Sequence, residues 1–419
     1  MTKSTSSLME STAPARRRRR RTGDRSQSLT PSYLPPARSG ALMLGTFALI
    51  AGGALALTEL DDGPTDLGAV AAASVDQRGS TLAIAAELGV TEVWEQGITG
   101  EGVNVAVVDT GVASVDALRD RVVAWTDLTG EAVDTETAGV DTHGHGTHLA
   151  GIVAGHDPST GFRGIAPDAG IVAVKVAGRD GTVMPSALVD GIHWVVDHAD
   201  EHGVGVLLLA FDAAEASELE ETRLLAAVER AWSAGIVVVT ATGNTGGVGL
   251  SAPASSESAI AVAAVDTTLD TPAPVDFGTI GDGERRPDLA APGAHVISLR
   301  APGSNADLDH PEGFVDDERF LGTGTSQAAA VVAGLAALML QAAPDASPDD
   351  VRAWLVESAR PVGTPAETGA GMPWLPAAID STPLDEPWSG QGWSGQGWSG
   401  QGWSGQGWSG QGWSGLSWS

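Results

Sequence analysis

Five continuous apolar runs recur through the middle of the chain, and each is rich in β-branched residues. The runs occupy residues 103–108, 171–176, 204–209, 236–240 and 260–265. Apolarity that is continuous rather than alternating is typical of strands that are covered on both faces. The pattern therefore predicts a sheet that is buried between two layers of other structure.

Helix-like stretches lie between several of these runs, for example over residues 185–198 and 217–234. Such an alternation of strands and helices is typical of a parallel sheet. We therefore predict an α/β fold with a mostly parallel central sheet and helices on both of its faces. Active sites of such folds gather at the carboxyl ends of the strands, so the residues that follow each run are the first candidates for chemistry.

Composition divides the chain into four parts. We predict a leader over residues 1–57, a short spacer over 58–78, a folded body over 79–379 and a low-complexity tail over 380–419. The leader holds nine of the 23 Lys and Arg residues but only two of the 53 acids. The remaining 14 basic and 51 acidic residues give the rest of the chain a net charge of −37. Such a charge repels phosphate backbones, so we expect no nucleic-acid partner.

The leader has the charge order of an export signal. Arginines at residues 16–21 precede an apolar stretch at 41–57, and the acids Glu59, Asp61 and Asp62 follow it. This order predicts a body that is secreted or anchored to the outer face of the cytoplasmic membrane. Both outcomes stay open, because 17 residues are long for a signal core and short for a membrane span. The alternative, a buried helix of the folded domain, would leave the flanking charges unexplained.

The tail repeats a five-residue unit that begins as Trp-Ser-Gly-Gln-Gly at Trp388 and ends near Trp418. Gly and Ser at this density cannot build a packed core, so we predict a disordered or conditionally ordered segment. Regularly spaced indole rings can stack on sugars, which favours contacts with cell-wall or polysaccharide material. A simple spacer is the alternative.

The absence of cysteine limits the candidate chemistry to Ser, Thr, His, Asp and Glu. Asp109 ends the first apolar run, and Gly111 lets the chain turn away sharply after it. The Asp109 carboxylate should therefore be presented at an edge of the sheet. An isolated aspartate in this place is equally typical of an ordinary loop or a helix cap, so Asp109 alone identifies no function.

Three histidines lie within six residues, at His143, His145 and His148. Glycines flank His145, and small residues that favour a closely packed helix follow it. Such a cluster also suggests a metal site, but His145 and His148 lack a nearby acidic third ligand in a familiar pattern. We therefore predict no metal site here.

Ser326 stands at the start of a long apolar helix that includes residues 331–340. An ordinary helix cap would explain one serine at this place. It would not explain Gly322 and Gly324, which clear the space that a closely approaching substrate backbone needs. The positive potential of the helix start would also favour a negative charge that develops near Ser326.

Together these blocks resemble the signatures of the subtilase family of serine endopeptidases. The blocks are Val107-Val108-Asp109-Thr110-Gly111, His145-Gly146-Thr147-His148-Leu149-Ala150-Gly151 and Gly324-Thr325-Ser326. Their order along the chain, Asp, His, Ser, is also the order of the subtilisin triad. The similarity extends over about residues 85–379, and the leader and tail further resemble exported actinobacterial subtilases.

The resemblance implies a subtilisin-like fold and an exported enzyme that hydrolyses protein or peptide substrates through an acyl-enzyme. Ser326 would be the nucleophile, His145 the general base and then acid, and Asp109 the group that orients His145. Asn244 resembles the family's oxyanion asparagine, whose loss in subtilisin costs about 2.7 to 4 kcal/mol. The amide of Ser326 would be the second oxyanion donor. The alternative for Asn244 is an ordinary turn residue.

The substrate-binding strand departs from the family pattern. The family usually has Asn-x-Ser-x-Gly where this chain has Leu208-Leu209-Ala210-Phe211-Asp212. The resemblance assigns substrate binding to Ala210, Phe211, Asp212 and Gly243. Asp212 replaces the glycine that lines the primary specificity pocket, which predicts a preference for Lys or Arg before the cleaved bond. In the alternative, Asp212 points into solvent and leaves specificity unchanged.

The competing functional interpretation is a catalytically impaired subtilase scaffold that acts as a binding or cell-wall-associated protein, with Asp212 obstructing the cleft. The presence of Asp109, His145, Ser326 and Asn244 together argues against it, because a binding protein has no physical need for all four. We expect no cofactor, although a structural calcium site is not readable from the sequence. We also expect a monomer.

Overall fold

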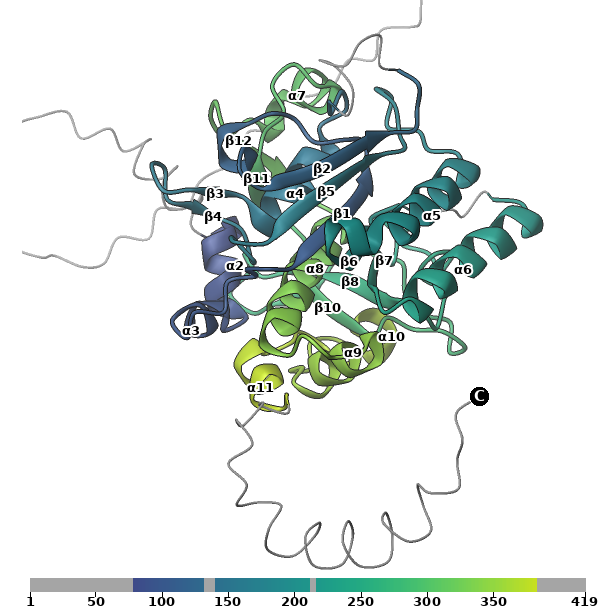
Figure 1. Cartoon of the computed structure of the whole chain (residues 1–419). Coiled ribbons are helices and arrows are strands. Elements are labelled where there is room, and N and C mark those ends of the chain that lie inside the picture. Colours follow the sequence, from purple (N-terminus) through teal and green to yellow (C-terminus); the bar gives the residue numbers. More distant parts are fainter. Residues whose placement is uncertain (1–77, 132–139, 212–215, 383–419) are drawn as a thin grey trace, which may run out of the picture. The chain divides into compact units, whose positions relative to one another are not determined.

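The computed structural model describes residues 78–131, 140–211 and 216–382 (Figure 1). The predicted leader, nearly all of the spacer and most of the tail lie outside the described residues, as does Asp212. The boundaries of those parts therefore stay predictions.

Seven parallel strands of an eight-stranded sheet form the centre of the described fold. Its strand order is β10-β8-β7-β6-β1-β5-β2, and every neighbouring pair in this order is parallel. The strands are β1 Asn104–Asp109, β2 Val122–Asp127, β5 Gly170–Lys175, β6 Val204–Leu209, β7 Val237–Ala241, β8 Ile260–Asp266 and β10 Leu289–Pro292. Short β9 Ala273–Pro274 pairs with β8 in the antiparallel sense. All five apolar runs are strands, which confirms the prediction of a buried, mostly parallel sheet.

Two small antiparallel pairs lie outside the main sheet, β3 His156–Asp157 with β4 Phe162–Arg163 and β11 Val296–Leu299 with β12 Arg319–Gly322. The helices, including two short 3₁₀ turns, are α2 Thr81–Glu87, α3 Val90–Trp94, η1 Asp116–Leu118, α4 His145–Ala154, α5 Pro185–His202, α6 Glu218–Ser233, α7 Asn305–Asp309, η2 Pro311–Gly313, α8 Thr325–Ala342, α9 Pro348–Glu357, α10 Pro365–Thr368 and α11 Leu375–Asp380.

Helices cover both faces of the sheet, as the continuous apolarity of the strands requires. Successive strand residues point to opposite faces, so Val105 and Val107 of β1 enter one core whereas Ala106 and Val108 enter the other. The first core contains α4 and α8, and the second contains α5 and α6, which lie side by side in Figure 1. This arrangement confirms the predicted fold class.

Helix α8 is the longest helix of the first core, and nearly all of its residues are buried. Among the described residues it is the one helix that is long and apolar enough to cross a membrane, and 89% of it is buried inside the fold. Its apolar character is therefore accounted for by packing against β6, β7, β8 and β10. Small residues allow this close packing, because an added Cβ at Gly334 would lie 2.6 Å from Ile165 Cβ.

We predict that Gly334→Ala destabilises the fold, although the same change inside an exposed helix usually stabilises by about 0.5 to 1 kcal/mol. The new methyl group collides with the branched, buried Ile165 side chain, and overpacking of this kind costs about 1 to 3 kcal/mol. Urea unfolding of the Ser326→Ala protein with and without the substitution measures the effect. Exposed Glu229→Ala on α6 is the control, expected within about 0.5 kcal/mol. A gain in stability for Gly334→Ala would contradict the prediction.

Candidate active site

The carboxylate of Asp109 and the imidazole of His145 form a direct hydrogen-bonded pair. Asp109 is the last residue of β1, and His145 is the first residue of α4. His145 Nδ1 lies 2.8 Å from Asp109 Oδ1 and 3.0 Å from Oδ2. The Asp109 side chain is 1% exposed and that of His145 is 23% exposed. One end of the imidazole is thus bound to a buried charge while the ring keeps access to solvent.

The electrostatic surroundings raise the pKa of His145 above its ordinary value. Burial alone would lower the pKa, because it disfavours the imidazolium. The charge of Asp109, its hydrogen bond and the more distant charge of Asp141 act in the opposite direction and together outweigh burial. His145 is therefore a stronger base than a free histidine.

Ser326 is the second residue of α8 and is 7% exposed. Its hydroxyl donates a hydrogen bond to the carbonyl oxygen of Ala210, at 3.1 Å. Within the described ranges, which include both residues, no hydrogen bond joins Ser326 to His145. The structure thus places Ser326 against the end of β6, where Ala210 follows Leu209.

Asn244 follows β7 and is tied to the start of α8. Its Oδ1 accepts hydrogen bonds from the Thr325 amide at 2.9 Å and the Thr325 hydroxyl at 3.0 Å. Gly243 also contacts Thr325, because the Gly243 amide donates to Thr325 Oγ1 at 3.2 Å. These bonds fix the orientation of the exposed Asn244 side-chain amide, and among the described residues its Nδ2 is left as a free donor. A Cβ at Gly324 would lie 2.9 Å from Gln327 Oε1 and 3.3 Å from Asn244 Nδ2, so a side chain there would crowd both groups.

Phe211 and Ala210, two of the predicted substrate-binding residues, contact different parts of the candidate site. The Phe211 ring centroid is 6.2 Å from that of His145, at an interplanar angle of 44°. Ala210 is buried and contacts Ser326 through its carbonyl oxygen. Asp212 lies outside the described residues, so its predicted place in the pocket stays a prediction.

The three neighbouring histidines do not converge on one point. His148 Nε2 donates to the carbonyl oxygen of Phe320 at 3.1 Å, and the His143 ring meets that of His145 edge-on at 6.4 Å. In the described part of the chain, no group of three or more His, Cys, Asp or Glu side chains is arranged to hold a metal ion.

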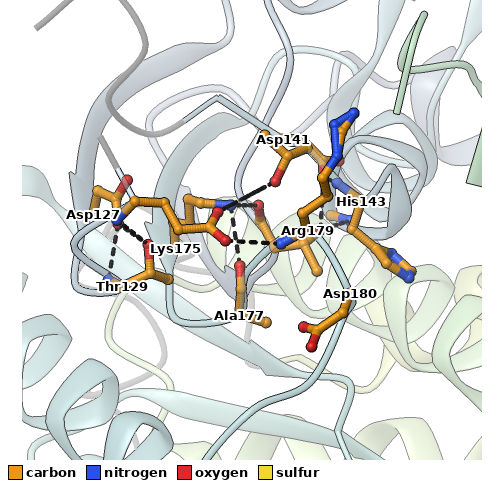
Figure 2. Close-up of polar contacts among 12 residues, drawn as sticks. Asp127, Thr129, Asp141, His143, Lys175, Ala177, Arg179 and Asp180 are labelled. Carbon is orange, nitrogen blue, oxygen red and sulfur yellow. Dashed lines mark hydrogen bonds and ion pairs between the residues drawn. The ribbon is translucent and has the colours of Figure 1, made fainter. Parts of the chain in front are cut away.

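A polar network beneath the pair was not anticipated from the sequence. The network is centred on Asp141, Thr110 and Lys175. Figure 2 shows Lys175 surrounded by the oxygen atoms to which it bonds. Lys175 is the largest fully buried side chain of the described fold. The signal was present, because Lys175 is the one lysine after Lys3 and stands at the end of an apolar run.

Comparison with known proteins defines the class of this chain. A family model described as the subtilase family matches residues 100–373. The chain therefore belongs to the subtilase family, and by this membership it is a subtilisin-like serine endopeptidase.

Individual relatives agree with this membership. The chain is 37% identical to serine protease AprX of Bacillus subtilis (strain 168) over 273 residues, which are 61% of each protein. It is 34% identical to subtilisin DY of Bacillus licheniformis over 285 residues, covering 67% of this chain and 92% of that protein. The solved structure of an S41 psychrophilic protease is similar with a TM-score of 0.57 and 27% identity, over 66% of this chain and 92% of the other. These relatives give no support to the actinobacterial resemblance.

We predict that His148 makes the fold sensitive to acid. Burial lowers its pKa to about 4 and outweighs the backbone groups of Phe320 and Val296, which favour the protonated ring. An unfolded histidine takes up a proton near pH 6.5, so the unfolded state binds more protons than the folded state between about pH 6.5 and 4. The free energy of unfolding should therefore fall by about 3 kcal/mol over this window through His148 alone.

The measurement is urea unfolding of the Ser326→Ala protein at pH 6.5 and pH 4, with and without His148→Gln. The glutamine keeps a donor for Phe320 but removes the titrating ring. We expect the variant to lose about 3 kcal/mol less than its parent as the pH falls. Equal losses in the two proteins would show that His148 does not carry the acid sensitivity.

Proposed function

We propose that this chain is an exported protease that cuts protein substrates through Ser326, His145 and Asp109. The observation that carries the proposal is the contact of His145 Nδ1 with both oxygens of the buried Asp109 carboxylate. Because Nδ1 is committed to Asp109, Nε2 is the imidazole atom that can accept a proton. Membership of the subtilase family supports the same roles.

The proposed reaction proceeds through an acyl-enzyme. Ser326 Oγ attacks the carbonyl carbon of the scissile peptide while its proton passes to His145 Nε2. The C–N bond then breaks as the imidazolium gives this proton to the leaving amine. Water repeats both steps on the ester, which releases the carboxylic acid and restores Ser326. Asp109 keeps the imidazole in the required tautomer and stabilises its cation.

In the resting enzyme the Ser326 hydroxyl is bonded to Ala210 rather than to His145. Hydrogen bonds of free active sites are often aligned differently from those of complexes. We propose that a substrate backbone pairs with the chain at Ala210 and competes for this carbonyl oxygen. The hydroxyl of Ser326 is then released to turn toward His145.

Two donors are proposed for the oxygen that becomes negative in the tetrahedral intermediate. The Asn244 amide is held by Thr325, so its Nδ2 is already oriented before substrate arrives. The Ser326 amide is one of the first four N–H groups of α8, which a helix leaves without internal partners. The positive end of the helix dipole favours the same negative charge.

Asp212, the leader and the tail would set the specificity and the location of the enzyme. Asp212 would select Lys or Arg before the cleaved bond by supplying a carboxylate, with Ala210, Phe211 and Gly243 forming the adjoining surface. The basic and apolar leader supports export, with the enzyme either secreted or held at the outer membrane face. The Trp-rich tail would contact cell-wall or polysaccharide material.

We predict that a fluorophosphonate reagent modifies Ser326 in the folded wild-type protein, and that Ser326→Ala or His145→Ala abolishes the modification. The rate of labelling should fall as the pH decreases through the pKa of His145, because only the neutral imidazole can act as a base. This pKa is raised, so the fall should begin above the ordinary histidine value of about 6.5. Peptide mapping by mass spectrometry identifies the modified residue.

Heat-unfolded wild-type protein is the control for non-specific reaction and should remain unlabelled. Folded protein that also stays unlabelled would favour the impaired binding scaffold. A labelling rate that does not change between about pH 5 and 8 would exclude His145 as the base.

A further inference from the structure

A second carboxylate, Asp141, is buried beside the Asp109–His145 pair and is only 4% exposed. From the described residues it accepts five hydrogen bonds. Its Oδ1 receives the Thr110 hydroxyl at 2.8 Å, the His143 amide at 3.0 Å and the Gly144 amide at 2.6 Å. Its Oδ2 receives the Thr147 amide at 2.8 Å and the Thr147 hydroxyl at 2.6 Å. Three backbone amides and two hydroxyl groups thus converge on this one carboxyl group.

These contacts fix the segment that carries His145. Gly144 is the cap residue of α4 and has no side chain with which to bind the helix amides. Asp141 supplies the missing acceptor from three residues upstream, and its bonds to Gly144 and Thr147 lie on either side of His145. A negative charge at this place also complements the positive end of the helix dipole.

The same carboxylate is linked to the turn that carries Asp109. The Thr110 hydroxyl has one proton and lies 2.8 Å from Asp141 Oδ1 but 3.2 Å from Asp109 Oδ1, so it donates mainly to Asp141. Its oxygen accepts the Gly146 amide at 2.9 Å. Thr110 in turn donates its own amide to Asp109 Oδ1 at 2.8 Å.

Lys175 holds Thr110 from the other side. Its Nζ donates to the Thr110 carbonyl oxygen at 2.8 Å. It also donates to the Ala177 carbonyl oxygen at 3.0 Å (Figure 2). Lys175 lies opposite Asp109 in the pairing of β5 with β1. The residue after Asp109 is therefore held at its hydroxyl by Asp141 and at its carbonyl by Lys175.

We propose that Asp141 is a positioning residue of the proteolytic reaction. It acts through Thr110 and the first turn of α4 to hold Asp109 and His145 in the relative orientation that their hydrogen bond needs. This inference rests on the proposed function, in which His145 is the base. Asp141 is the one described side chain that bonds both to the turn after β1 and to the start of α4 on either side of His145. Small displacements of reacting groups lower the rate by large factors, so losing the contacts of Asp141 should lower the rate of the reaction.

Asp141 also acts on His145 through its charge. The charge of Asp141 raises the pKa of His145, so its removal should lower that pKa. Other titratable groups near His145 remain in place in the experiment below. They are Asp109 at the end of β1, His143 before α4 and His148 within α4, while Lys175 at the end of β5 contacts Thr110.

The experiment compares Asp141→Asn and Thr110→Val with wild type, using peptide hydrolysis over pH and thermal unfolding. We expect Asp141→Asn to lower kcat by about ten- to hundredfold, with KM changed less than about twofold. Its acid limb should move to lower pH, because His145 loses a nearby negative charge. Thr110→Val should lower kcat while its acid limb stays in place, because the charge of Asp141 remains.

Asp350→Asn is the matched control, because Asp350 is a carboxylate that caps the start of α9 with an acceptor for Ser347. It should lower the unfolding temperature without changing kcat or the pH profile. Wild-type kcat and an unmoved acid limb in Asp141→Asn would overturn the proposal. Wild-type kcat in Thr110→Val would overturn it as well, even if Asp141→Asn fails to fold. An inactive wild type would instead overturn the proposed function on which the inference rests.

Discussion

The hydrogen bond between the buried carboxylate of Asp109 and His145 is the interaction on which the rest of the site depends. A buried charge costs several kcal/mol unless hydrogen bonds and an opposite charge compensate it. Asp109 obtains both from the Thr110 amide and from His145, whose cation it stabilises. Because Asp109 is the last residue of β1, the end of this strand fixes the charge that raises the pKa of His145. The other elements of the site must therefore approach the end of β1.

The fold meets this constraint with helix starts and glycines. Helix α4 can approach the end of β1 only because residue 146 has no side chain, since a Cβ there would lie 2.2 Å from the Gly111 carbonyl oxygen. Helix α8 begins at the same edge and is tied to the loop after β7 through Asn244 and Thr325. The proposed acid, base, hydroxyl and oxyanion donors thus come from the ends of β1 and β7 and the starts of α4 and α8.

Buried parallel strands and glycine-flanked residues leave local patterns, so the sequence allowed the fold class and the pairing of Asp109 with His145 to be predicted. The catalytic roles of Ser326 and Asn244 stay predictions. Strand β2 was missed because it is the edge strand, and its Val123 and Trp125 are half exposed. Asp141 was missed because its role arises from contacts with Thr110 and α4 that no spacing records. The bond from Ser326 to Ala210 depends on a side-chain rotamer, which sequence patterns do not determine.

A titration of His145 by ¹⁵N NMR tests the central claim most directly. The measurement uses the Ser326→Ala protein, which prevents self-cleavage, and assigns the two ring nitrogens by comparison with His145→Gln. The account predicts that Nδ1 carries the proton in the neutral ring, that Nε2 does not, and that the ring titrates above the ordinary histidine value of about 6.5. A ring that titrates below that value, or that carries its neutral proton on Nε2, would contradict it.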